Sequence, residues 1–161
     1  MSATLIPREE VRALGESLRR EGRRIAFANG CFDILHVGHV RYLEEARRWG
    51  DVLVVGVNSD RAVAALKGQG RPILRAEGRA ELVAALESVD YVVIFDGLTA
   101  AEILLDLLPD VHCKGTDYSE ETVPEREVVK SFGGRVRIVG DPKNHSTREL
   151  LAEISRRTQG K

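Results

Sequence analysis

The stretch RIAFANGCFDILHVGH, residues 24–39, decides how this chain folds. Its first part, RIAFA at 24–28, is an apolar run whose length suits a buried β-strand. A glycine-containing loop follows, and residues 39–49 then carry apolar side chains at helical spacing. The stretch therefore predicts a strand that leads through a loop into a helix.

The same alternation continues along the chain. Further apolar runs predict strands at 51–58, 91–95, 111–114 and 135–139. Helical patterns are found at 7–22, 61–66, 80–89, 99–108, 125–132 and 146–157. Five strands separated by helices predict an α/β fold: a Rossmann-like, doubly wound, five-stranded parallel sheet with helices on both faces. In such a sheet ligands bind beyond the carboxyl ends of the strands, so the segments after strands are the ones to inspect.

Composition excludes several classes of protein. The 161 residues are 43% hydrophobic and 30% charged, which is typical of a folded globular domain, and the net charge is only -1. Without a basic excess and with 5% aromatic residues, neither a nucleic-acid partner nor a membrane partner is expected. Two cysteines, Cys31 and Cys113, make no disulfide framework, and the N-terminus lacks the apolar region of a signal peptide. A cytoplasmic location is therefore expected.

The loop after the first strand carries two histidines, His36 and His39, where a helix begins. At this spacing both rings can share the first helical turn, whose free amides attract anions. Gly30 and Gly38 allow the backbone to approach a ligand closely, and histidine can donate hydrogen bonds in either protonation state. The pattern indicates a phosphate-binding site. Two other interpretations remain open. One is a purely structural helix start with two partly buried histidines. The other is a zinc site made by Cys31, His36 and His39 with His112 or Cys113.

The string GCFDILHVGH resembles the G-x-F-D-x-x-H-x-G-H signature of the cytidylyltransferase-like nucleotidylyltransferases, which carry the H-x-G-H version of the HIGH motif. The resemblance extends over 24–155, the expected catalytic core of a single domain 1–161 that begins with an N-terminal helix within 1–22. The later motifs are most similar to the heptose 1-phosphate adenylyltransferase branch of this family. They are VNSD at 57–60, LKG at 66–68, RPI at 71–73, Arg79, VD at 89–90, KGTDY at 114–118 and ST at 146–147.

The resemblance implies transfer of a nucleoside monophosphate from ATP to a sugar 1-phosphate, D-glycero-β-D-manno-heptose 1-phosphate, giving ADP-heptose and pyrophosphate. The residues implied in catalysis are His36, His39, Lys67 and Lys114. Those implied in nucleotide binding are Asn29, Gly30, Cys31, Phe32, Asp33, His36, His39, Lys114, Gly115, Asp117, His145, Ser146 and Thr147. Those implied in substrate binding are Asn58, Lys67, Arg79 and Tyr118.

Some positions allow a structural interpretation or depart from the family pattern. Asp33 is expected to orient His36 or the helix start, with a place near magnesium as the alternative. Ser146 reads as an N-cap in a capping box with Glu149, and Thr99 as the start of another box with Glu102. Departures from the pattern of the relatives are Leu74, Arg75, His145 and Arg148.

The resemblance also implies partners and a cofactor. Mg²⁺ would bind largely through the nucleotide, a homodimer is expected, and a separate sugar kinase would supply the acceptor. The alternative activity is a CTP-dependent cytidylyltransferase for glycerol 3-phosphate or another phosphorylated alcohol. A non-catalytic nucleotide-binding domain is a second rival. A dinucleotide-dependent dehydrogenase is disfavoured, because no G-x-G-x-x-G follows the first strand.

Overall fold

The computed structural model describes residues 2–142 and 146–160, and its centre is a parallel sheet of six strands in the order β1-β4-β3-β2-β5-β6. Every neighbouring pair is parallel. The expected doubly wound parallel fold is confirmed, with one strand more than predicted. The strands are β1 (Thr4–Leu5), β2 (Ile25–Gly30), β3 (Val52–Asn58), β4 (Tyr91–Phe95), β5 (Val111–Lys114) and β6 (Arg135–Ile138).

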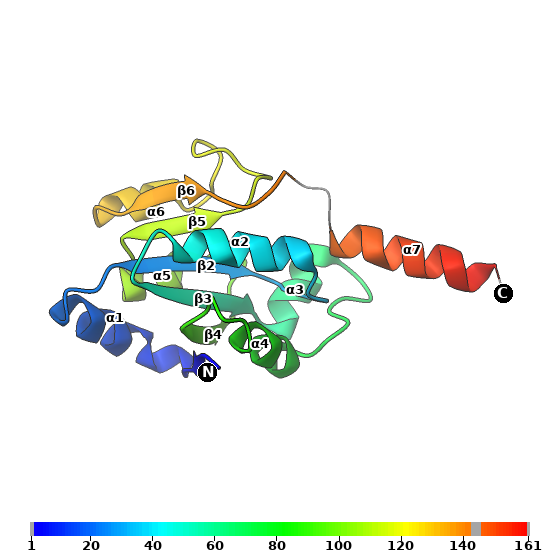
Figure 1. The fold of residues 1–161 in the computed structure, drawn as a ribbon, viewed down its shortest axis with the longest axis horizontal. Helices are drawn as coiled ribbons and strands as arrows, with labels where there is room; N and C mark the ends of the chain where they lie inside the picture. The colour runs from blue at the N-terminus through cyan, green and yellow to red at the C-terminus, as the bar shows by residue number, and fades with distance from the viewer. Residues whose placement is uncertain (1, 143–145, 161) are drawn as a thin grey trace.

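Helices cover both faces of the sheet (Figure 1). One core cluster contains residues from α2 and α4, and the other contains residues from α1, α5 and α6. The helix α7 has no buried side chain and projects away from the body of the protein in Figure 1. The helices are α1 (Val11–Arg20), preceded by a 3-10 turn at Arg8–Glu10, α2 (Val37–Arg47), α3 (Asp60–Lys67), α4 (Ala76–Ala84), α5 (Ala101–Leu107), α6 (Arg126–Ser131) and α7 (Thr147–Gln159).

The order of the strands reverses at β2. From β2 the chain builds β3 and β4 on one side, and then crosses to build β5 and β6 on the other. A crevice therefore opens beyond the carboxyl end of β2, which is the usual ligand position in such sheets. The signature loop and its two histidines leave β2 at this point.

Several features differ from the prediction, among them the helix expected at 80–89, which is α4 at Ala76–Ala84. β1 was not expected because its two residues make no apolar run; it exists through pairing of Thr4 with Tyr91 on β4. The expected capping box at Thr99 is wrong, because α5 begins at Ala101 with Ala100 as N-cap. The Ala100 amide donates instead to the carboxylate of Glu125, 25 residues away.

Among the residues described, no helix is both long and apolar enough to span a bilayer.

Gly56 on β3 provides a test of this packing. A Cβ there would lie 2.9 Å from Cε1 of Phe95 and 3.0 Å from Cζ of Phe27, two buried rings. We expect Gly56→Ala to lower the free energy of unfolding by about 1–3 kcal/mol through overpacking. The matched control is Gly78→Ala at an exposed position of α4, where a Cβ meets nothing within 4 Å. Urea unfolding should show the control unchanged or stabilised by up to about 1 kcal/mol; equal stability of the two variants would contradict this packing.

Candidate active site

A cavity of about 770 Å³ opens at the carboxyl ends of the strands. It is lined by residues from the loops that follow five strands and from the start of α7. Residues predicted from the sequence make up much of its wall: Asn29, Gly30, Cys31, Phe32, Asp33, His36, His39, Asn58, Lys67, Lys114, Gly115, Asp117, Tyr118, Ser146, Thr147 and Arg148. His145 lies outside the described residues, and Arg79 does not line the cavity.

The two histidines form the start of α2, which begins at Val37, two residues earlier than predicted. Nδ1 of His36 accepts a hydrogen bond from the Gly38 amide at 3.1 Å, and Nδ1 of His39 accepts one from the His36 amide at 3.2 Å. The rings stack with centroids 3.9 Å apart. Because each Nδ1 is an acceptor, each neutral ring carries its proton on Nε2. The helix start thus fixes the tautomer and the orientation of both rings.

The loop before these histidines has an unusual backbone. Phe32 and Ile34 have φ values of 50° and 66°, in the left-handed region that a β-branched side chain rarely adopts. Thr147 at the start of α7 donates its hydroxyl proton to the carbonyl of Asp33 at 2.8 Å. Such backbone persists where surrounding contacts hold it, and this contact brings the start of α7 against the signature loop.

Asp33 is the carboxylate that anchors this loop. Its oxygens accept hydrogen bonds from the amides of Ile73 and Leu74 at 2.8 and 2.9 Å, and from Nε of Arg71 at 2.8 Å. Burial would raise the pKa of Asp33, but the two amides and the guanidinium outweigh it and hold the pKa below its ordinary value. The expectation that Asp33 orients His36 or the helix start is therefore wrong about the partner: Asp33 fastens the loop at 71–74.

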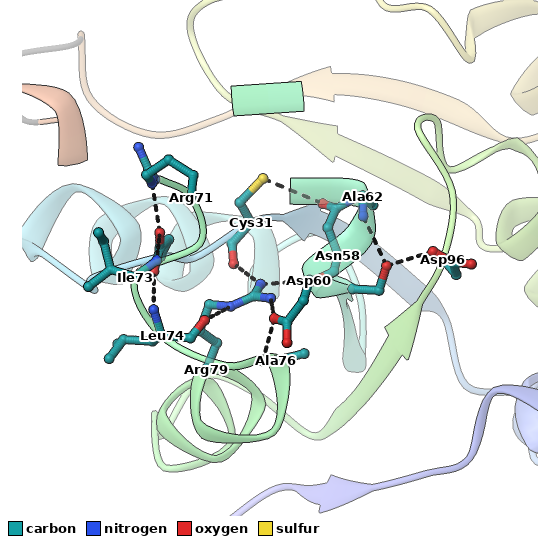
Figure 2. Close-up of polar contacts among 12 residues, drawn as sticks. Cys31, Asn58, Asp60, Ala62, Arg71, Ile73, Leu74, Ala76, Arg79 and Asp96 are labelled. Carbon is teal, nitrogen blue, oxygen red and sulfur yellow. Dashed lines mark hydrogen bonds and ion pairs between the residues drawn. The ribbon is translucent and has the colours of Figure 1, made fainter. Parts of the chain in front are cut away.

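Arg79 has a structural position instead of the expected contact with substrate. Its side chain is fully buried. It donates to the carbonyls of Cys31, Asn58 and Leu74 at 2.6, 2.8 and 2.9 Å, and to the carboxylate of Asp60 at 2.8 Å (Figure 2). These bonds employ four of the five guanidinium N–H groups. Arg79 therefore holds the ends of β2 and β3 together from behind the cavity.

The family departures have different surroundings. The backbone amide of Leu74 donates a hydrogen bond to Asp33, and its carbonyl accepts one from Arg79. Arg75 is the exposed N-cap of α4 and does not line the cavity, whereas Arg148 does. The Ser146 hydroxyl accepts from the Glu149 amide at 3.1 Å, which confirms the expected N-cap.

Lys114 leaves the end of β5 and enters the cavity wall. Its ammonium lies 4.9 Å from the centroid of the Tyr118 ring. Burial lowers the pKa of Lys114, against the opposing effect of nearby Glu125. Burial likewise raises the pKa of the Cys31 thiol. Lys67 ends α3 and contributes an exposed cation to the cavity wall.

Several cavity residues were not found from the sequence. Tyr42 on α2 donates its hydroxyl proton to the carbonyl of Cys113 at 2.8 Å. Arg71 and Glu125 carry charge into the wall. Arg71 belongs to the RPI motif at 71–73, but the sequence assigned it no role, and Glu125 stands in no motif. Glu125 was predicted only as the first residue of the helix at 125–132.

The zinc alternative gains no support from the geometry. His112 and Cys113 are buried within β5, where the His112 ring stacks on Phe27 at 5.7 Å. Across 2–142 and 146–160, no three or more His, Cys, Asp and Glu side chains are grouped so that they could hold a metal ion. Both histidine Nδ1 atoms are committed to backbone amides.

Comparison with known proteins decides the family. The cytidylyltransferase-like family model matches residues 27–155. This chain belongs to the cytidylyltransferase-like family. The bifunctional protein HldE of Syntrophotalea carbinolica is 47% identical over 147 residues, 91% of this chain and 30% of that protein. The HldE of Geobacter sulfurreducens is 48% identical over 136 residues, 84% of this chain and 28% of that protein.

This member of the cytidylyltransferase-like family thus spans about 30% of the length of its curated relatives. A solved lipopolysaccharide core biosynthesis protein from Thermoplasma volcanium is 31% identical, with a TM-score of 0.62, and the match covers 73% of this chain and 95% of that one. Pantothenate synthetase from Thermus thermophilus matches with a TM-score of 0.61 at 22% identity, over 89% of this chain and 63% of that one. The second likeness shows the shared fold alone.

Asp33→Asn tests the anchoring role of the signature carboxylate. The Asp33 side chain is fully buried, and removing its charge leaves Arg71 facing a neutral amide, so we expect a loss of about 3–5 kcal/mol in the free energy of unfolding at pH 7. Since the pKa of Asp33 is lowered from 3.8, its contribution to stability is complete above about pH 5 and fades as the pH falls further. The difference in the free energy of unfolding between the wild type and Asp33→Asn should therefore become smaller in acid.

The control for this measurement is Asp96→Asn, whose carboxylate pairs with Arg61 on the surface and should change stability little. Thermal unfolding from pH 7 to pH 3 compares the three proteins. The anchoring role would be refuted if the stability difference between the wild type and Asp33→Asn stayed constant over this pH range. Equal stability of Asp33→Asn and Asp96→Asn would refute it as well.

Proposed function

We propose that this chain transfers AMP from ATP to D-glycero-β-D-manno-heptose 1-phosphate, giving ADP-heptose and pyrophosphate. The observation that carries the proposal is the stacked pair His36 and His39, fixed by backbone bonds at the start of α2 and lining the cavity. The start of α7, with Ser146 and Thr147, lines the same cavity. Two helix N-termini and several cations then face one space, which suits a triphosphate.

The reaction needs little covalent help from the protein. The acceptor phosphate is already ionised at neutral pH, so its oxygen can attack the α-phosphorus in line without a strong general base. Catalysis then rests on positioning and on stabilising charge in the transition state. His36 and His39 donate from Nε2 to the α-phosphate and the departing pyrophosphate. Lys67, Lys114, Ser146 and Thr147 hold the phosphate tail.

Mg²⁺ would neutralise phosphate charge in this reaction and is expected to bind mainly to the oxygens of the nucleotide. The donor set of the chain fits this arrangement, because Asp33, the carboxylate of the signature, is already committed to Arg71 and to two amides. The protein's part is to orient the phosphates that carry the cation.

The acceptor, the partners and the location rest on the family resemblance. The motifs after the signature are similar to those of the heptose branch, and one solved relative is described as a lipopolysaccharide core biosynthesis protein. A sugar kinase would provide the 1-phosphate, and a homodimer in the cytoplasm is the expected form. Both cysteines are free, which is consistent with a reducing compartment.

A CTP-dependent transfer to glycerol 3-phosphate or another phosphorylated alcohol is the second candidate, because the same phosphate machinery serves both reactions. Pyrophosphate release with ATP and with CTP, each against sugar 1-phosphates and glycerol 3-phosphate, separates the two. A non-catalytic nucleotide-binding domain would release no pyrophosphate with any pair.

The variants His36→Asn and His39→Asn test the role of the rings while keeping the hydrogen bonds of the helix start. Each new side chain retains an oxygen near the position of Nδ1 that can accept the backbone amide bond, but its amide is too short to donate from the position of Nε2. We expect each to reduce the rate of pyrophosphate release by about 10²–10³-fold, as loss of one preorganised donor does elsewhere. Circular dichroism should show an unchanged fold.

Glu44→Gln, on an exposed position of the same helix, is the matched control and should keep the wild-type rate. Near-normal pyrophosphate release by both histidine variants would refute the proposed role of the pair.

A further inference from the structure

Arg71 is a cavity residue to which the proposed reaction assigns no task. Its Nε donates to Oδ2 of Asp33 at 2.8 Å, and this is the single hydrogen bond that the guanidinium makes within 2–142 and 146–160. A guanidinium carries five N–H groups, so the four on its two Nη atoms are not used by the fold. Arg71 lines the cavity, and its side chain is 15% exposed, so a ligand in the cavity can reach it.

The contact with Asp33 fixes where these donors lie. The Asp33 side chain is fully buried and also accepts hydrogen bonds from the amides of Ile73 and Leu74, so its own position is set by the fold. A long side chain that is already held loses less entropy when it binds a ligand. Because the carboxylate is buried and its charge is shared among three donors, an anion in the cavity meets the Nη groups of Arg71 and not Asp33.

The backbone of Asp33 indicates which part of a ligand lies near Arg71. Thr147, the first residue of α7, donates its hydroxyl proton to the Asp33 carbonyl at 2.8 Å. Arg71 and the start of α7 are thus both attached to Asp33, one through its side chain and the other through its carbonyl. Three residues later the same loop reaches His36, the N-cap of α2. A phosphate bound between the starts of α2 and α7 therefore lies beside Arg71.

The leaving group of the proposed reaction requires a donor of this kind. When AMP is transferred, the β- and γ-phosphates depart as pyrophosphate and gain negative charge in the transition state. A planar guanidinium can bind two phosphate oxygens at once, whereas a lysine ammonium acts as a point charge. We propose that the Nη groups of Arg71 bind the β- and γ-phosphates of ATP and hold the departing pyrophosphate. This inference rests on the proposed AMP transfer.

Arg71→Lys tests the proposal, because it retains a cation for Asp33 but loses the planar pair of donors. Calorimetric titration without acceptor should show the Kd for ATP with Mg²⁺ rising about 10- to 100-fold, as loss of hydrogen bonds to a charged group does. Inorganic pyrophosphate should lose affinity by a similar factor. The Kd for AMP should stay at the wild-type value, because AMP lacks both phosphates that Arg71 binds.

The matched control is Arg75→Lys, at an exposed arginine that ends the same loop and does not line the cavity. It should leave the Kd of all three ligands unchanged. If Arg71→Lys fails to fold, the double variant Asp33→Asn with Arg71→Gln removes both charges together and leaves no buried charge unpaired. The double variant should show the same loss for ATP and pyrophosphate, with AMP unaffected.

A purely structural role of Arg71 predicts a different pattern of affinities. If Arg71 only anchored its loop, a folded variant would lose affinity for AMP together with ATP, or would lose neither. Either result overturns the inference and leaves the transfer reaction intact. A wild-type chain that binds ATP but releases no pyrophosphate with any sugar 1-phosphate would instead overturn the proposed function, so the two failures are distinguishable.

Discussion

The guanidinium of Arg79 fastens three separate backbone segments beneath the cavity floor. Its bonds to the carbonyls of Cys31, Asn58 and Leu74 join the loops that follow β2 and β3 to the segment before α4. Asp60 adds a carboxylate, which also accepts from the Ala76 amide at the start of α4. A buried cation needs such a full set of acceptors, so these segments cannot move apart without exposing it. The loop geometry of the whole site depends on this arrangement.

Some charged side chains of the site pair with other parts of the protein, and others are left available to a ligand. The carboxylate of Asp33 binds the loop at 71–74, where it pairs with Arg71. Arg71 itself lines the cavity. Lys67 and Lys114 also line the cavity, and neither ammonium is hydrogen-bonded to a carboxylate among the described residues. In the proposed function these two cations are therefore available to phosphate.

The sequence predicted the parts of this protein that local patterns encode. Buried parallel strands such as β3 are continuous apolar runs, and the histidine turn is one contiguous string, so both could be read directly. The buried structural position of Arg79 could not be predicted, because a motif indicates that a residue is important without showing that it is buried. Asp33 and Glu125 likewise find their partners 41 and 25 residues away, Leu74 and Ala100 respectively. Long-range pairings of this kind leave no periodicity.

A structure of the protein with a non-hydrolysable ATP analogue and Mg²⁺ tests the central claim most directly. The account predicts the triphosphate between the starts of α2 and α7, with Nε2 of His36 and Nε2 of His39 within hydrogen-bond distance of phosphate oxygens. A triphosphate bound elsewhere, with the two rings turned inward or ligating a metal ion, would contradict it.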